Sequence, residues 1–508
     1  MTPARKFMAT TALGLSLMAT TAAADLTAAQ VWGDWRAYLE GMGYTVTSTQ
    51  TTTGNTLAVS DLAVQMSGTR AMNMRIGTLE FVENGDGSVD IVMPPRLPMT
   101  IDIAADDVSP ASELSLDYVQ SGHKMTARGD AAAMTYDYNA DSFALTLASL
   151  TVDGVPVDAN SARFALSGND LTSQTNVSAG ETRSYDQSVE VGSLTYDLMF
   201  NEPDTVEAVS IQSTLGAITF EGTSTMPVDA APQSQDFTPL ITSGFAFDGT
   251  FAKQGSETQF EVTSVDGTSR VKTASASSTL GVAMGQDGLR YDVDARDIQI
   301  GAELAGLPIP LFAQMAQSGL QLRTPVIKSD DPQDFKLAFN MTDLTMSDII
   351  WAMFDPAGQL PRDPATFALD LSGKAKVLSD PFDAEAVQQA ATTGAYPAEV
   401  EALTINRLTL DAVGAQVEAT GDIAFDNTDK VTLPGFPKPV GDININIAGA
   451  SALLDRLVAM GMLPPDQVMG ARMMLGLFAI PGDGPDTLKS TIEFNEAGEI
   501  LANGQRIR

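Results

Sequence analysis

The chain has 508 residues, of which 64 are acidic and 29 basic, and its formal net charge at pH 7 is −35. It contains no cysteine, which excludes disulfides, thiolate catalysis and cysteine-ligated metals. The acidic charge argues against nucleic acid as a partner, because phosphate backbones are bound by cationic surfaces.

The first 24 residues have the pattern of a secretory signal peptide. Arg5 and Lys6 form a positive start, Phe7–Ala19 is an uncharged, largely apolar run, and three alanines ending at Ala24 provide small residues for a signal peptidase. The apolar run is shorter than the roughly 20 residues that span a bilayer. We expect cleavage after Ala24, no transmembrane anchor in the remaining chain, and a periplasmic location.

A helix is predicted directly after this segment. Thr27 and Gln30 fit a capping box, in which each side chain accepts a hydrogen bond from the other residue's backbone N–H. Apolar side chains then recur at helical spacing, and the acidic and basic side chains, Asp34 among them, fall mostly off that stripe. The stripe consists of Val31, Trp35, Leu39 and Met42. We expect this helix to pack over a sheet.

The rest of the chain is predicted to be mostly β-structure. Apolar residues alternate with polar or small ones in several runs, as half-buried strands require. These runs include Leu280, Val282 and Met284; Leu289, Tyr291 and Val293; Phe335, Leu337, Phe339 and Met341; Phe367, Leu369 and Leu371; and Ile443, Ile445 and Ile447. Turn signals such as Asp266-Gly267 separate them, and strands joined by tight turns pair antiparallel. The predicted fold class is α+β, dominated by a long, twisted or curled antiparallel sheet with short covering helices.

A change in composition divides the chain into two β-rich regions. Residues 226–240 are rich in Pro, Ala, Gln and Ser and are predicted to be a linker or long loop. The N-terminal region, residues 25–225, then contains the leading helix, and the C-terminal region covers residues 241–508. Short apolar helices are expected within the latter over residues 308–317, 347–354, 451–460 and 466–478, the last two forming a terminal pair.

Two of these helices are so apolar that each must be buried or must contact an apolar partner. Their side chains are therefore candidate ligand-binding residues: Ile349, Ile350, Trp351, Met353 and Phe354 in the first, and Met473, Met474, Leu477 and Phe478 in the second. Methionine suits surfaces that accommodate variable apolar partners. The alternative interpretation is an ordinary core beneath the sheet.

Residues for catalysis or metal binding are sparse. His123 is the single histidine, and no G-x-S-x-G motif accompanies it, so we interpret it as a surface residue. Ser269-Arg270-Val271-Lys272 matches S-x-x-K, but it lacks the helical context and the companion motifs of serine–lysine enzymes. We expect no cofactor, no metal site and no catalytic residues. A hydrolase with two carboxylates stays open, because such a pair is defined by its spatial separation.

The sequence resembles the bacterial domain of unknown function 2125 family. The resemblance is carried by Val31–Val46, Gly77–Pro94, Leu403–Asp426, the strand at Gly441 and the closing Asn503–Arg506, and we expect it to cover the chain from residue 25. It implies an exported envelope protein and supplies no catalytic residues. The C-terminal segment is also similar to the ends of AsmA-type envelope proteins, a resemblance that implies a curled sheet with an apolar groove.

These observations leave three functional hypotheses. The first is a non-enzymatic periplasmic protein that holds an apolar ligand or lipid. The second is a structural or protein-interaction role in the envelope with a dry core, and the third is the two-carboxylate hydrolase. A continuous open apolar surface would favour the first, and a packed interior would favour the second.

Overall fold

The computed structural model describes residues 25–66, 71–180, 182–202, 205–227, 238–307, 309–379, 381–382, 387–389, 392 and 396–508. The predicted signal peptide, residues 1–24, lies outside these residues, and so does segment 228–237 of the predicted linker. Strands account for 62% and helices for 12% of the structure, which confirms the β-dominated fold class.

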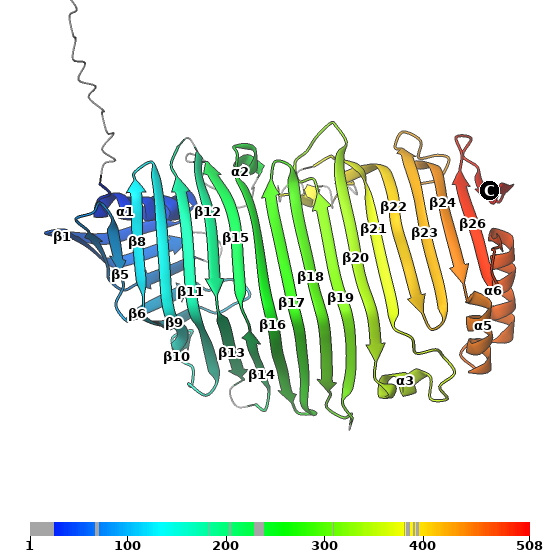
Figure 1. Cartoon of the computed structure of the whole chain (residues 1–508), viewed down its shortest axis with the longest axis horizontal. Coiled ribbons are helices and arrows are strands. Elements are labelled where there is room, and N and C mark those ends of the chain that lie inside the picture. The colour runs from blue at the N-terminus through cyan, green and yellow to red at the C-terminus, as the bar shows by residue number, and fades with distance from the viewer. Residues whose placement is uncertain are drawn as a thin grey trace, which may run out of the picture.

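The described strands form one 28-stranded antiparallel sheet. Figure 1 shows that the strands follow one another along the long axis of the molecule, with α1 at the N-terminal end and α5 and α6 at the C-terminal end. The strand β15 pairs directly with β16, so the hydrogen-bonded ladder continues from one side of the predicted linker to the other.

The N-terminal strands are mostly short and change neighbours often. They are β1 (Thr45–Thr53), β2 (Thr56–Met66), β3 (Met72–Ile76), β4 (Leu79–Glu83), β5 (Val89–Val92), β6 (Arg96–Ile103), β7 (Ser112–Ser121), β8 (Lys124–Asp130), β9 (Ala133–Val152), β10 (Val155–Pro156), β11 (Ala162–Ser178), β12 (Thr182–Val191), β13 (Ser193–Asn201), β14 (Ala208–Leu215) and β15 (Ile218–Pro227).

The strands from β16 to β24 are long, and each pairs with the next one in the chain. This second set is β16 (Ala246–Ser264), β17 (Gly267–Gly285), β18 (Gly288–Glu303), β19 (Leu311–Thr324), β20 (Gln333–Met346), β21 (Ala365–Val377), β22 (Ala398–Ala412), β23 (Ala415–Asp426) and β24 (Lys438–Ala448). Four short strands follow: β25 (Ile480–Pro481), β26 (Thr487–Phe494), β27 (Ile500–Ala502) and β28 (Gln505–Arg506).

Five helices contribute to the argument below. They are α1 (Ala28–Gly41), α2 (Thr238–Thr242), α3 (Asp348–Phe354), α5 (Ala450–Ala459) and α6 (Pro465–Phe478). The predicted capping box at α1 is present, since Thr27 Oγ1 accepts from the Gln30 N–H at 3.2 Å and Gln30 Oε1 accepts from the Thr27 N–H at 2.9 Å. The predictions for 347–354, 451–460 and 466–478 are confirmed by α3, α5 and α6.

The predicted helix over residues 308–317 is wrong. Residues 311–317 form the first half of β19, where Leu311, Ala313 and Met315 are half-buried while Phe312 and Gln314 are exposed. The strand is hydrogen-bonded to β18 on one side and β20 on the other. Two ladders of backbone hydrogen bonds therefore override the local helix propensity of this apolar segment.

The packed hydrophobic core lies at the N-terminal end of the sheet. The fully buried side chains of Val31, Val59, Phe81, Val89 and Ile91 come from α1 and from strands β2, β4 and β5. Described apolar residues that are buried farther along, from Val326 to Ala502, are scattered and do not join this cluster. The long C-terminal part of the sheet is therefore built differently from the N-terminal part.

Asp34 lies off the predicted apolar stripe of α1 and is nevertheless removed from solvent. It is buried on α1, accepts a hydrogen bond from Tyr136 Oη at 2.7 Å and is ion-paired with Arg183. These two partners compensate for the cost of removing the carboxylate from water. They also tie the leading helix to β9 and β12.

Candidate apolar ligand site

Cross-strand pairing brings the predicted apolar positions into continuous rows. Directly paired residues of antiparallel strands point to the same face of a sheet. One row crosses the sheet from β12 to β24 through Val189, Phe220, Phe251, Leu280, Val293, Leu320, Phe339, Leu369, Leu408, Ala419 and Ile445. With strands spaced about 4.8 Å apart, the row is roughly 50 Å long.

A second row lies two residues along the same strands, except on β22, where a register shift between Ile405 and Leu408 makes the step three residues. The second row is therefore on the same face as the first. It runs through Val282, Tyr291, Leu322, Leu337, Leu371, Ile405, Gly421, Ile443 and Ile492. We call these two rows the apolar face. Its members are half-buried or exposed, apart from the buried Ala419 and Gly421, and Phe339 exposes 36% of its surface. The side chains are thus in contact with one another but accessible from outside.

The alternate residues of the same strands are polar. Asp422, Asp442 and Glu493 form one paired row across β23, β24 and β26, and Thr420, Asn444 and Thr491 form another. Asn444 Oδ1 accepts from Thr491 Oγ1 at 2.8 Å, as is typical of a solvated ladder. This part of the sheet is therefore amphipathic, with the acidic residues on the face opposite the apolar one.

Left-handed backbone positions accompany a shift in the apolar alternation. In β18 the apolar residues are odd-numbered as far as Val293 and even-numbered from Ile298, and Asp297 between them has φ +50°. In β20 the same change falls between Met341 and Leu344, next to Asp343 at φ +55°. A residue in this conformation rotates the backbone that follows it, so that the next side chains point to the opposite face from the one that strict alternation would give. The apolar residues on both sides of the break thus keep to one side of the sheet.

An apolar cavity lies at the C-terminal end of the apolar face. Its volume is about 540 Å³, and it is lined by Leu410, Val417 and Ile447 from the sheet, Leu453 and Leu454 from α5, and Ala471, Met474, Leu475 and Phe478 from α6, with Ala412, Val413, Ala415 and Ala450 beside them. The three sheet residues are paired with one another and lie two residues along their strands from Leu408, Ala419 and Ile445 of the first row. The cavity is therefore continuous with the apolar face, and its size is within the range of small-ligand sites, roughly 300–1,000 Å³.

Half of the α6 candidates line this cavity. Met474 and Phe478 contribute to its wall, whereas Met473 and Leu477 are not among the lining residues and lie exposed, Met473 by 71%. The run of methionine and leucine in the sequence does not distinguish the two sides of the helix. The position of the cavity, whose lining also includes residues of β22–β24, makes that distinction.

The α3 candidates divide in a similar way. Trp351 is buried, with its ring 5.0 Å from that of Phe354 and the Arg362 guanidinium 5.7 Å above it. Ile349 and Ile350 are half-buried, while Met353 is 67% and Phe354 37% exposed. These residues make a local packing unit that leaves one apolar side open.

The structure does not bring the two candidate helices together. Helix α3 contacts β19, whereas α6 contacts α5, which in turn contacts β23. Strands β20, β21 and β22 lie between β19 and β23 (Figure 1). Sequence reasoning assigned ligand binding to the helices and treated the alternating strand residues as ordinary sheet. The alternation itself was the signal for the apolar face, but the alternation does not show that the face is uncovered.

The fold does not bring together the residues considered for catalysis. His123 is half-buried beside Tyr138, and burial lowers the pKa of the imidazole. Ser269 and Lys272 lie three residues apart on β17 and therefore point to opposite faces, and Ser269 Oγ accepts from the Ala305 N–H at 3.0 Å. Among the described residues, no cluster of three His, Asp or Glu side chains is placed to hold a metal ion, and no helix is long and apolar enough to cross a bilayer.

Comparison with known proteins identifies one family. Residues 250–501, from β16 to β27, match the family described as "Uncharacterized protein conserved in bacteria (DUF2125)". The match includes Leu403–Asp426 and the strand at Gly441 but neither the predicted N-terminal segments nor the closing Asn503–Arg506. No curated protein and no solved structure matches the chain, so the likeness to AsmA-type proteins stays a prediction. Residues 250–501 are thus similar to this family of uncharacterized bacterial proteins.

Proposed function

We propose that this protein is an exported, non-enzymatic envelope protein that binds lipid acyl chains along its apolar face. The observation that carries the proposal is the continuous row of accessible apolar side chains from β12 to β24. Contiguous exposed apolar surface of this extent on a folded protein marks a site of interaction.

Two features favour an acyl chain over another protein surface. The apolar face leads into the cavity between α6 and the sheet, which a flexible chain can enter but a flat protein surface cannot fill. The net charge of −35 also opposes self-association of two copies. A lipid is compatible with both features when its tail lies in the cavity and along the two rows of the apolar face.

The apolar face can supply enough free energy for such binding. Each methylene group removed from water contributes about 0.8 kcal/mol. Ten buried methylenes would therefore contribute roughly 8 kcal/mol before the entropic cost of ordering the chain. No buried polar partner is required for affinity at this level, and the headgroup can remain in solvent.

The proposal of export rests on residues 1–24. The positive start at Arg5 and Lys6, the apolar run and the alanines before Asp25 together support a cleaved signal peptide. Mature protein expressed in a Gram-negative host should begin at Asp25 and appear in the soluble periplasmic fraction, as determined by N-terminal sequencing. Recovery of Met1-containing protein in the membrane pellet would contradict this part of the proposal.

Lipid binding can be located with a photoreactive side chain on either face of one strand. Leu408 and Thr409 are neighbours on β22, so one belongs to the apolar face and the other to the polar face. We expect benzoylphenylalanine at position 408 to crosslink to phospholipid or fatty acid when the full chain is purified from the periplasm. The same group at position 409 is the matched control and should yield little lipid adduct. Mass spectrometry of the adducts provides the measurement.

Two results would contradict lipid binding. One is protein from which organic solvent extracts no lipid and whose position-408 variant forms no adduct. The other is a position-408 variant that crosslinks to a second copy of the chain or to one other protein, which would support the structural role instead.

A further inference from the structure

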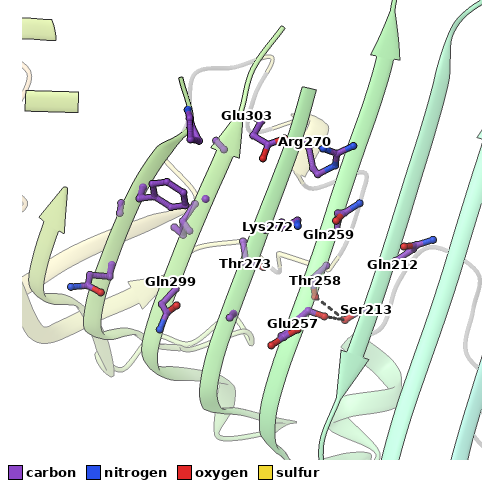
Figure 2. A pocket seen from close by; sticks show the side chains of 18 of the residues that line it. Gln212, Ser213, Glu257, Thr258, Gln259, Arg270, Lys272, Thr273, Gln299 and Glu303 are labelled. Carbon is purple, nitrogen blue, oxygen red and sulfur yellow. Dashed lines mark hydrogen bonds and ion pairs between the residues drawn. The ribbon is translucent and has the colours of Figure 1, made fainter. Parts of the chain in front are cut away.

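A second, polar hollow lies over the strands from β13 to β20. Its volume is about 890 Å³. Figure 2 shows Gln259, Lys272 and Gln299 on the neighbouring strands β16, β17 and β18. Pairing places Gln212, Gln259 and Lys272 in one cross-strand row, and Gln299 beside Gln314 in another. The lining residues on these rows therefore point to one face.

The amides of this hollow are free of partners within the described part of the protein. The side chains of Gln212, Gln259, Gln299 and Gln314 make no hydrogen bond to any other described residue, and Lys272 makes no ion pair to one. Some amides elsewhere on the sheet are engaged: Asn406 Nδ2 donates to Asp370 at 3.1 Å, and Gln174 Nε2 donates to Asp137 at 3.0 Å. The hollow therefore contains several side-chain hydrogen-bond donors and acceptors that have no partner among the described residues.

The other charges of the hollow largely cancel one another. The Arg270 guanidinium donates to Glu261 at 2.6 Å and to Glu303 at 2.9 Å, on the strands to either side. Lys272 and Glu257 add one charge of each sign, and the remaining charged lining residue, Asp197, is paired with Arg163 at 3.1 Å. The hollow thus carries no excess of positive charge, which favours a neutral ligand over a phosphate.

An exposed aromatic ring completes the lining. Phe312 exposes 56% of its surface, and its ring lies over Gly301, where the lack of a side chain leaves room for it; a β-carbon there would come within 3.2 Å of the ring. Aromatic rings present flat apolar surfaces, and amides both donate and accept hydrogen bonds, as sugar hydroxyls also do. We propose that this hollow binds a neutral, linear oligosaccharide, with Phe312 beneath a sugar ring and the glutamines on its hydroxyls.

The proposal is independent of the proposed lipid function and is tested by saturation-transfer NMR. Full-chain protein is titrated with maltohexaose, cellohexaose and hexa-N-acetylchitohexaose. We expect at least one of them to bind, and both Phe312→Ala and the double variant Gln259→Ala/Gln299→Ala to weaken it about tenfold, the usual order for a lost aromatic contact or pair of hydrogen bonds. Gln321→Ala, an exposed glutamine of β19 outside the hollow, is the matched control and should bind as the wild type does.

All of these substitutions are at exposed or half-exposed positions, so unfolding curves should coincide with that of the wild type and confirm that the fold is retained. Absence of binding by all three sugars would overturn the proposal and leave the hollow as a solvated sheet surface. Binding that persists in both hollow variants would overturn the assignment of the sugar to this site.

Discussion

Trp351 and Phe354 belong to the same short helix but differ in exposure, and their substitution should reveal how much of α3 is core. Trp351 is buried against Phe354 and Arg362. We expect Trp351→Ala to lower the free energy of unfolding by about 3–5 kcal/mol, because it leaves a cavity. Phe354→Ala removes a side chain already 37% exposed and should cost roughly 1–2 kcal/mol. Urea unfolding measures both, and equal losses would show that α3 is a closed core.

Asp355, directly after α3, links stability to pH. The backbone N–H of Leu360 first, and that of Gln359 with it, lower the pKa of the buried carboxyl below its ordinary 3.8. The carboxylate therefore stabilises the fold above pH 3.8, and this contribution is lost as the pH falls through the lower folded-state pKa. We expect Asp355→Asn to be destabilising at pH 7 and less so near pH 3, in denaturant titrations at both pH values. A loss that does not depend on pH would contradict the role of the charge.

At the scale of elements, the cavity beside α6 can be filled from the helix itself. Ala471 lines the cavity, whereas Met473 lies on the exposed side of the same helix. We expect Ala471→Phe to occupy part of the 540 Å³ and to reduce uptake of a fluorescent fatty acid severalfold, with little loss of stability because it adds apolar contacts. Met473→Phe introduces the same ring outside the cavity and should leave uptake unchanged, as measured by fluorescence titration. Equal effects of the two variants would place fatty acid binding elsewhere.

Helices and hairpins were predictable from sequence wherever the local capping, turn and periodicity signals agreed with one another. The capping box at Thr27 and the Asp266-Gly267 turn determine a helix start and a hairpin, and both are present. The segment after Leu311 was not predictable, because its apolar side chains suit a buried helix or a central strand equally. Long-range pairing with β18 and β20 decides between them.

Prediction of the candidate site was limited for the same reason. The alternation in Leu280–Met284 and Ile443–Ile447 identified one apolar side of each strand, but only the register joins those sides across the sheet. Exposure of the resulting face depends on what packs against it, which no local pattern encodes. Asp34 is the opposite case, a charged residue that is buried. Its burial depends on Tyr136 and Arg183 from distant strands.

At the scale of the whole molecule, stability should be uneven along the sheet. Side chains in β4 and β5, such as Phe81 and Ile91, are fully buried beneath α1, whereas those of β20–β22 on the apolar face are half-buried or exposed. Regions with few buried apolar contacts open at lower free energy than packed cores. We therefore expect the N-terminal core to be the last part of the protein to open.

Hydrogen–deuterium exchange with mass spectrometry tests this expectation and the lipid proposal together. In protein stripped of lipid, peptides from β4–β5 should exchange at least about tenfold more slowly than those from β20–β22, a ratio that corresponds to about 1.4 kcal/mol of opening free energy. Added oleate should slow exchange in β20–β24 by covering the apolar face, and it should leave β4–β5 unchanged, which makes that region the internal control. Uniform protection without ligand would mean that the long sheet is as well packed as the N-terminal core. An equal effect of oleate on both regions would indicate that fatty acid does not act through the apolar face.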